Sequence, residues 1–173
     1  MPVFASLPRK HLMSPWEENG WVALSQCILN SYNRLVGREL VEQTGSKVEQ
    51  AERLFRAPFV VIAHGREADP ILSYGNNTAL QLWKLSIPVL LKTPSRETTE
   101  PIHRDDRVRV LDRTTRDGYV DDYRGIRIAT NGERFQVERA TVWNLTDGSG
   151  KPLGQAATFS SWTMLNSEPQ LHD

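Results

Sequence analysis

The stretch from Ile126 to Val137, which reads Ile-Arg-Ile-Ala-Thr-Asn-Gly-Glu-Arg-Phe-Gln-Val, decides the fold of the chain. Its Asn131-Gly132 pair lies between two runs in which apolar and polar residues alternate, a combination typical of a β-hairpin. A two-residue loop there pairs Ile128 with Phe135. It also pairs Ile126 with Val137 and places these four side chains on one face of the hairpin. The chain is therefore predicted to end in antiparallel sheet.

Strand patterns continue on both sides of this hairpin. Its second strand extends past residue 143, and the turn residues 147–150 lead into a final strand over 153–162. Earlier in the chain, the β-branched run 59–63 and the short run 71–74 predict two more strands. The sheet is thus predicted to have five strands.

Two helices are predicted before the first strand. Residues 14–17 and 46–49 both have the pattern of a capping box, with Ser at the N-cap and Glu three residues later. Apolar residues at spacings of three and four follow the first box as far as Gly37, which suits a helix C-terminus. The second helix should bury Val48, and it ends before Pro58.

Further helices are predicted between the second and third strands. Asn76 is suited to cap a helix that carries Trp83. A longer helix starts at Pro101 and ends at Gly118. Its expected inward-facing positions are Ile102, Val108 and Leu111.

The order of the predicted elements is two helices, two strands, helices and three strands, which is the order of a PAS-type fold. The fold class is therefore α+β: a PAS-like antiparallel five-stranded sheet with helices on one face, preceded by an N-terminal two-helix extension. This organisation divides the chain into a flexible N-terminus (1–13), a helical extension (14–57), a PAS-like core (58–164) and a flexible tail (165–173).

Charge and cysteine content exclude several classes of function. The chain has 173 residues with 21 Lys+Arg against 21 Asp+Glu, so its formal net charge is zero. This balance argues against broad nucleic-acid binding, which depends on an excess of basic residues. The single cysteine, Cys27, excludes an internal disulfide and a multi-cysteine metal cluster. No apolar run approaches the ~20 residues that span a bilayer, so we expect a cytoplasmic protein without membrane contact.

Motifs spread along the chain resemble the MEKHLA domain family. The matching segments, in the family's order, are 61–65, 69–71, 74–76, 79–83, 94–96, 125–128, Phe135, 142–143 and 154–157. The polar and proline residues of these motifs include His64, Asp69, Pro70, Asn76, Pro94, Ser95 and Arg96. The resemblance covers residues 16–164 and implies a PAS-related fold. It implies the stand-alone bacterial type, because this sequence lacks the homeodomain and leucine zipper of the plant members, and it implies no particular ligand or reaction.

His64 and Asp69 are five residues apart across a turn. One hypothesis is that they form a pair for acid–base chemistry or metal binding. The alternative, which we favour, is that both side chains hydrogen-bond the backbone of the turn. The other histidines are scattered without a zinc-type spacing, so no metal site is predicted.

Neither haem nor flavin is predicted as a cofactor. His103 lies near the start of the helix that carries the axial ligand in haem-binding PAS proteins, but a histidine in a first helical turn is more often exposed to solvent. Cys27 precedes the PAS-like core, and the flavin-adduct motif of light-sensing PAS domains is missing from the sequence. We therefore expect Cys27 to be a half-buried small apolar residue and the purified protein to be colourless.

Arginines and aspartates alternate between residues 101 and 127. The arginines are Arg104, Arg107, Arg109, Arg113, Arg116, Arg124 and Arg127. A solvent-exposed surface with salt bridges is the simplest interpretation. Arg139 differs, since strand alternation places it on the same face as Phe135 and Trp143. An arginine on that apolar face needs a carboxylate, an anionic ligand or solvent at the edge of the sheet.

A cavity is predicted beside the last strand, which has only small side chains over Gly154–Ala157 apart from Gln155. Small residues next to large ones leave room for a guest, and the Gln155 amide can both donate and accept. The alternative is that the helix with Trp83 fills this space, and alternation does not decide whether Ala156 or Ala157 faces inward. The candidate lining residues are Tyr74, Trp83, Arg127, Phe135, Arg139, Trp143, Gln155, Ala156 and Thr158.

Three functions fit the sequence. The first is a PAS-like module that binds a small molecule or senses a signal without catalysis. The second is a ligand-free interaction module, and we expect a homodimer through the apolar residues of the helix over 14–36. The third is an enzyme that uses His64, Asp69 and Arg96, and it ranks last because no set of nucleophile, base and orienting residue is recognisable. The ligand and the signalling partner are not identified by the sequence.

Overall fold

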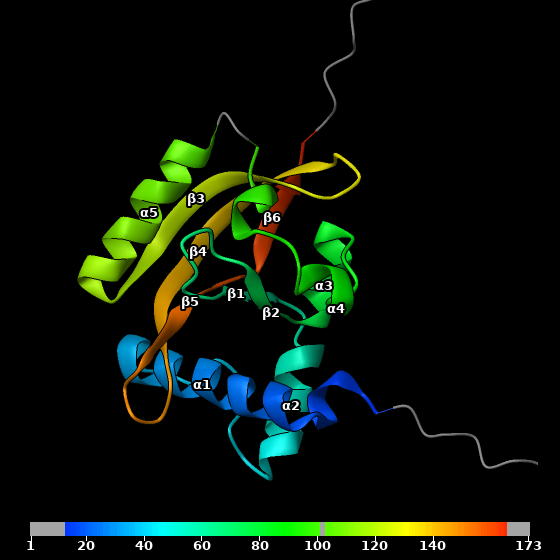
Figure 1. Ribbon diagram of the computed structural model, residues 1–173, viewed down its shortest axis with the longest axis vertical. Helices are drawn as coiled ribbons and strands as arrows, with labels where there is room; N and C mark the ends of the chain where they lie inside the picture. Colours follow the sequence, from blue (N-terminus) through cyan, green and yellow to red (C-terminus); the bar gives the residue numbers. More distant parts are fainter. Residues whose placement is uncertain (1–12, 101–102, 166–173) are drawn as a thin grey trace, which may run out of the picture.

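The computed structural model describes residues 13–100 and 103–165. Helical elements come first and strands last, with one strand pair in between (Figure 1). In chain order the elements are η1 (Pro15–Glu17), α1 (Asn19–Val36), α2 (Lys47–Arg56), β1 (Val60–His64), β2 (Leu72–Gly75), α3 (Asn77–Trp83), α4 (Ile87–Leu90), η2 (Ser95–Thr98), α5 (Arg104–Asp117), β3 (Tyr119–Ile128), β4 (Arg134–Thr146), β5 (Pro152–Phe159) and β6 (Ser161–Met164).

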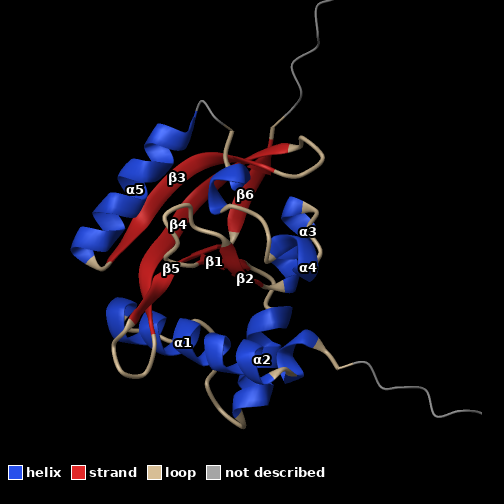
Figure 2. Cartoon of the chain, viewed as in Figure 1, coloured by secondary structure: helices blue, strands red, loops and turns tan. Residues whose placement is uncertain are grey.

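The strands form one antiparallel sheet, which is the centre of the molecule (Figure 2). Its strand order is β2-β1-β5-β4-β3, and β6 pairs with the first half of β4. Helices α3, α4 and α5 contact one face of the sheet, while α1 and α2 lie against the other face. The predicted antiparallel sheet with attached helices and an N-terminal helical extension is therefore confirmed.

The helix ends follow the local sequence. Both capping boxes are present, at Ser14 and at Ser46, although the first one opens the short η1 and α1 begins two residues after η1 ends. Gly37 ends α1 with a φ of 83°, a conformation that favours glycine. Asn76 caps α3, since its side chain accepts from the backbone N–H of Ala79.

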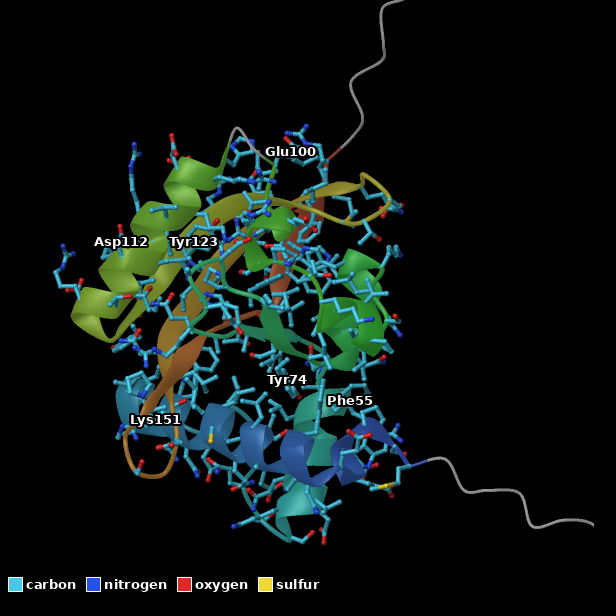
Figure 3. All side chains as sticks on the ribbon, in the orientation of Figure 1. Phe55, Tyr74, Glu100, Asp112, Tyr123 and Lys151 are labelled. Carbon is cyan, nitrogen blue, oxygen red and sulfur yellow. The ribbon has the colours of Figure 1, made fainter. Side chains whose placement is uncertain are left out.

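The core consists of two apolar clusters, one on each face of the sheet. The cluster under α1 and α2 contains large aromatic residues, including Trp21, Tyr74 and Trp143. Figure 3 shows Tyr74 between the sheet and α1, whereas Tyr123 lies on the side of α5. The second cluster lies under α3, α4 and α5 and includes Trp83 and Phe135. The sheet is thus buried on both faces.

The register of the Asn131-Gly132 hairpin differs by one residue from the predicted one. Phe135 pairs with Arg127 and Val137 pairs with Gly125, instead of with Ile128 and Ile126. The loop is longer than two residues, because the N–H of Ala129 donates to the carbonyl of Glu133. Gly132, with a φ of 85°, takes the left-handed position of a three-residue loop. This register turns Arg127 toward the interior.

Arg139 does not share an apolar face with Phe135 and Trp143, contrary to the prediction. Its φ of 48° marks a bulge in β4, and its side chain is exposed. The extra residue reverses the alternation along the strand. Phe135 consequently faces α3, and Trp143 faces α1.

The predicted final strand over 153–162 is two strands. Strand β5 ends at Phe159 and pairs with β1 and β4, whereas β6 begins at Ser161 and pairs with residues 135–138 of β4. The break lies opposite the bulge at Arg139, where β4 changes direction (Figure 1). The sheet therefore has six strands.

Two helix positions are corrected as well. Val48 and Val108 were expected inside, but they are 41% and 49% exposed. Gln50 and Arg107 are buried in their helices instead, because the inward stripe of each helix lies one or two positions away from the valine. The predicted flexible ends, 1–13 and 165–173, and the helix start at Pro101 and Ile102 fall almost entirely outside the described residues.

The apolar face of α1 is covered within the chain. Trp21 packs against Tyr74 with ring centroids 4.7 Å apart, and Tyr32 packs against Trp143 at 4.9 Å. Ile28 is fully buried in the same cluster. Homodimerisation through α1 stays a prediction, and these side chains are the ones already packed against the sheet.

Candidate functional site

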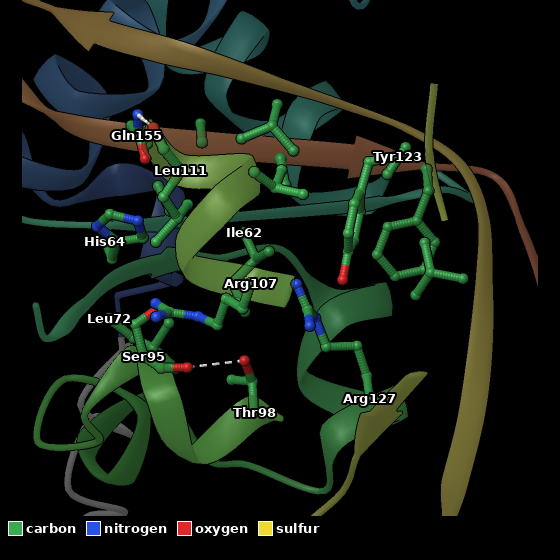
Figure 4. A pocket seen from close by; sticks show the side chains of 18 of the residues that line it. Ile62, His64, Leu72, Ser95, Thr98, Arg107, Leu111, Tyr123, Arg127 and Gln155 are labelled. Atoms are coloured by element: carbon green, nitrogen blue, oxygen red, sulfur yellow. Dashed lines mark hydrogen bonds between the residues drawn. The ribbon is translucent and has the colours of Figure 1, made fainter. Parts of the chain in front are cut away.

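A small cavity lies between the sheet and the layer formed by α3, η2 and α5. Its volume is about 60 Å³. Apolar side chains form most of its surface, while a polar side is formed by arginine and hydroxyl groups (Figure 4). The apolar group consists of Ile62, Ala63, Leu72, Trp83, Val110, Leu111, Val137, Ala140, Val142, Ala156, Ala157 and Phe159, and the polar group consists of His64, Ser95, Thr98, Arg107, Tyr123, Arg127 and Gln155.

Arg107 extends from α5 to the cavity and is only 7% exposed. Its Nη2 donates to the hydroxyl of Ser95 in η2. Burial lowers the pKa of Arg107 to about 10, and the positive charge of Arg127 contributes to the shift. The guanidinium is still protonated at neutral pH, so a positive charge lies at the cavity.

Arg127 reaches the same cavity from β3. Its Nη1 donates to the hydroxyl of Thr99 at 2.7 Å, and its guanidinium carbon lies 5.0 Å from the centre of the Tyr123 ring. Burial lowers the pKa of Arg127, while Tyr123 opposes the shift. In Figure 4 the guanidinium of Arg127 points toward the hydroxyl end of Tyr123, whereas that of Arg107 lies nearer to His64 and Ser95.

Gln155 connects the sheet to α5 at another side of the cavity. Its amide nitrogen lies 3.1 Å from both the carbonyl oxygen of Leu111 and the hydroxyl of Thr115. Gly154 lets β5 lie close to the end of β1, because a Cβ at this position would lie 1.9 Å from the carbonyl oxygen of His64. The position of α5 thus depends directly on β5.

His64 is half-buried at the cavity, and its Nδ1 lies 2.9 Å from the carbonyl oxygen of Gly65. A carbonyl oxygen only accepts, so Nδ1 carries the proton and a neutral ring has a free acceptor at Nε2. That Nε2 is buried without a hydrogen-bond partner among the described residues. Burial lowers the pKa of His64, and the charge of Arg107 acts in the same direction. His64 is therefore neutral at pH 7.

The remaining motif residues hold η2 beside β2. Arg96 Nε donates to both carboxylate oxygens of Asp69, at 3.1 and 3.2 Å, on the surface. The N–H of Ser95 donates to the carbonyl of Pro70 at 2.7 Å, and Pro94 pairs with Ile71. Asp69 is thus bonded to Arg96, and the described residues show no hydrogen bond between Asp69 and His64. Through Ser95, this segment also fixes Arg107.

Asn76 has a structural position away from the cavity. It is fully buried, and its side chain hydrogen-bonds the N–H of Val61 and the carbonyls of Leu54 and Phe59. It therefore connects the end of α2, strand β1 and the start of α3.

The predicted cavity residues are divided by the sheet. Those that line the cavity are Trp83, Arg127, Gln155 and Ala156, although Ala156 borders it from the cluster on the α1 face, where it packs with Trp143. Those that lie elsewhere are Tyr74 and Trp143 on the α1 face, Phe135 behind Trp83, Thr158 bonded to the carbonyl of Val60, and exposed Arg139. Arg107 was missed because it was grouped with the exposed arginines of α5. Its spacing of three, four and seven residues from Val110, Leu111 and Thr114 is the pattern that identifies it as inward-facing.

The cavity does not fit a flavin or a haem. Pockets for organic ligands usually have volumes of roughly 300–1,000 Å³, whereas this one has about 60 Å³. The residues considered for such cofactors are not among its lining residues: Cys27 lies on α1 across the sheet, and His103 lies at the start of α5, 3.9 Å from Glu100. Burial raises the pKa of the half-buried Cys27 thiol, so it is not an activated nucleophile.

Within residues 13–100 and 103–165, no group of three metal-ligating side chains converges. The same residues contain no helix that is both long and apolar enough to span a bilayer.

Comparisons with known proteins agree with this architecture. The model of the MEKHLA domain family matches residues 22–164. The PAS domain of a protein from Colwellia psychrerythraea superposes with a TM-score of 0.56 and 9% identity over 68% of this chain and 94% of that chain. A fungal LOV domain photoreceptor superposes with a TM-score of 0.51 and 15% identity over 80% of this chain and 91% of that one. No curated protein matched the sequence. The likeness to these structures confirms the PAS-like fold class.

Proposed function

The chain belongs to the MEKHLA family, and on that premise we propose that it is a sensory module that binds a small molecule in the cavity under α5 and catalyses no reaction. The observation that carries this proposal is the cavity itself. A buried charged side chain, Arg107, borders a space of about 60 Å³ that the surrounding apolar residues leave open. Protein interiors are normally close-packed, so a space beside a buried charge indicates a place for a guest.

Occupancy of the cavity would act on α5 and η2. Arg107 and Leu111 belong to α5, and Ser95 belongs to η2, so a guest in contact with them changes how both elements rest on the sheet. Gln155 bonds α5 to β5. A ligand can shift a conformational equilibrium of the protein only if its contacts differ between the two conformations. The position of α5 on the sheet is the feature that would differ between them.

The arrangement of side chains favours binding over catalysis. Ser95 accepts a hydrogen bond from Arg107, and Nδ1 of His64 is bonded to Gly65. Neither pair has the geometry of a nucleophile activated by a base. A ligand-free interaction module remains the competing function, and the experiment below distinguishes it.

The test is native mass spectrometry of the purified protein beside Ala157→Leu. Ala157 lines the cavity, so a leucine there fills the space. We expect wild type to retain or bind a small molecule and Ala157→Leu to lose it. Absence of any bound molecule, together with no chemical-shift change of the Trp83 indole in a screen of small organic compounds, would favour the ligand-free module.

A further inference from the structure

The two arginines at the cavity differ from several other arginines around them. Several neighbours have carboxylate partners: Arg96 with Asp69, Arg113 with Asp122, Arg124 with Glu138 and Arg134 with Glu100. Arg107 and Arg127 have hydroxyl partners, Ser95 and Thr99, and no carboxylate within 4 Å among residues 13–100 and 103–165.

A hydroxyl does not neutralise a guanidinium. Each guanidinium has five N–H donors, and the described residues accept from Arg107 at one nitrogen only. Removal of an unpaired charge from water is unfavourable unless an opposite charge accompanies it. Arg107 is nevertheless 93% buried, since its exposed fraction is 7%, and it lies close enough to Arg127 for the two charges to oppose each other.

The other charged groups near this pair leave it positive. The negative charge of Asp69 favours the charged form of Arg107, but both carboxylate oxygens of Asp69 are bonded to Arg96 on the surface. Arg104 adds another positive charge, and His64 is neutral. Among the residues that the structure describes, no carboxylate therefore lines the polar side of the cavity.

We propose that the cavity takes a small monocarboxylate, whose carboxylate lies at Arg107 and Arg127. This inference rests on the proposed function and names the ligand class. The planar guanidinium matches a carboxylate with two parallel hydrogen bonds.

The apolar lining of the cavity determines the rest of the ligand. Among the lining residues, Ile62, Leu72 and Val142 offer no polar partner wherever they border the cavity, so the part of the ligand beyond the carboxylate is apolar. The volume of about 60 Å³ limits that part to a short chain, because a cavity of 150 Å³ already holds benzene. A phosphate or nitrate has the charge but no apolar part to contact these residues.

The first experiment compares acids with their neutral amides on the wild-type protein. Acetate, propionate and butyrate are titrated at constant ionic strength and followed by the Trp83 indole resonance, beside acetamide, propionamide and butyramide. We expect saturable binding of the acids and binding of the amides that is weaker by about tenfold or more. Inorganic phosphate and nitrate form two further arms, and we expect neither to compete with propionate.

The second experiment removes each charge. Arg107→Gln and Arg127→Gln should each weaken propionate binding by about tenfold or more, whereas Arg109→Gln should not change it. Arg109 is the matched control, because it lies on the same helix with its side chain 78% exposed and bonded to Asp106. If Arg107→Gln does not fold, Arg127→Gln and the acid–amide comparison still decide.

The outcomes separate this inference from the proposed function. Equal binding of acid and amide, or unchanged binding in both variants, would overturn the carboxylate assignment and leave a ligand cavity in place. Binding of phosphate or nitrate without binding of carboxylates would overturn it as well. If no acid, amide or anion binds and mass spectrometry finds no guest, the proposed function fails together with it.

Discussion

The two faces of the sheet differ in how closely the helices pack against them. Under α1 and α2, large aromatic side chains pack against one another: Trp143 is fully buried, and its indole N–H donates to Ser31 at 3.0 Å. Under α5, the same strands carry smaller residues such as Ala157 and Val142, and a cavity with two arginines remains. One face binds the N-terminal helical extension to the sheet, and the other contains a cavity beside α5.

This difference indicates where the molecule can respond. A closely packed aromatic layer has one arrangement, because a displacement of any ring forces its neighbours to move. Helix α5 rests on the sheet partly through polar contacts, from Gln155 and from Arg107 by way of Ser95. Polar contacts around a partly empty space rearrange more readily than a filled core. We therefore assign stability to the α1 face and ligand response to the α5 face.

The largest expected effect is loss of the aromatic layer. Trp143→Ala should reduce the free energy of unfolding by about 3–5 kcal/mol, because it removes a fully buried indole and leaves a cavity. Urea denaturation followed by circular dichroism measures this change. Trp143→Phe, which keeps most of the ring volume, is the control and should retain most of the stability. A loss below about 1 kcal/mol for Trp143→Ala would show that the α1 face is not closely packed.

A smaller effect on stability is expected at the bulge in β4, which places Phe135 and Trp143 on opposite faces of the sheet. Arg139 has a φ of 48°, a conformation in which a non-glycine side chain is strained. Arg139→Gly should raise the free energy of unfolding by about 0.5–1 kcal/mol, and Arg139→Val should lower it by about 1 kcal/mol or more. Thermal and urea unfolding of both variants check the sign. Stabilisation by valine would mean that β4 continues without the bulge, and Phe135 and Trp143 would then share a face.

The smallest expected effect is a change in how the free energy of unfolding depends on pH, caused by His64 at the cavity. Burial lowers the pKa of His64 in the folded state from 6.5, so below pH 6.5 the unfolded chain binds a proton that the folded chain resists. The contribution of His64 to stability is therefore complete above pH 6.5 and declines as the pH falls below it. Unfolding by urea between about pH 5 and pH 8 should show a shallower decline for His64→Gln than for wild type. Identical slopes would place His64 in solvent.

Features determined by neighbouring residues could be predicted from the sequence. The capping boxes at Ser14 and Ser46, the helix end at Gly37 and the cap at Asn76 depend on contacts within a few residues. The order of the elements along the chain followed from these local patterns, and the PAS-like fold class followed from that order and from the family resemblance. The hairpin was located correctly, but its register was not, because Asn131-Gly132 suits both a two-residue loop and the end of a three-residue loop.

The site was harder to predict, because it depends on which side of an element faces the sheet. A single residue of positive φ at Arg139 moved Trp143 to the opposite face, and alternation contains no sign of such a residue. Arg127 was named for the cavity, and the shifted register is what turns it inward. Arg107 was grouped with exposed arginines, from which it differs only in its position around the helix. The bulge and the shifted register need the three-dimensional structure, whereas the helical spacing of Arg107 is a signal that the sequence contains.

The measurement that tests the central claim most directly is a pair of matched substitutions on β5. Ala156 faces Trp143 and Ala63 in the filled cluster, whereas Ala157 faces Ile62 and Val142 in the cluster with the cavity. The unfolding free energies of Ala156→Leu and Ala157→Leu are compared with that of wild type. We expect Ala156→Leu to lose about 1–3 kcal/mol through overpacking and Ala157→Leu to lose little or to gain stability by filling the cavity. Equal losses at both positions would contradict the account, because they would show that both faces of the sheet are filled.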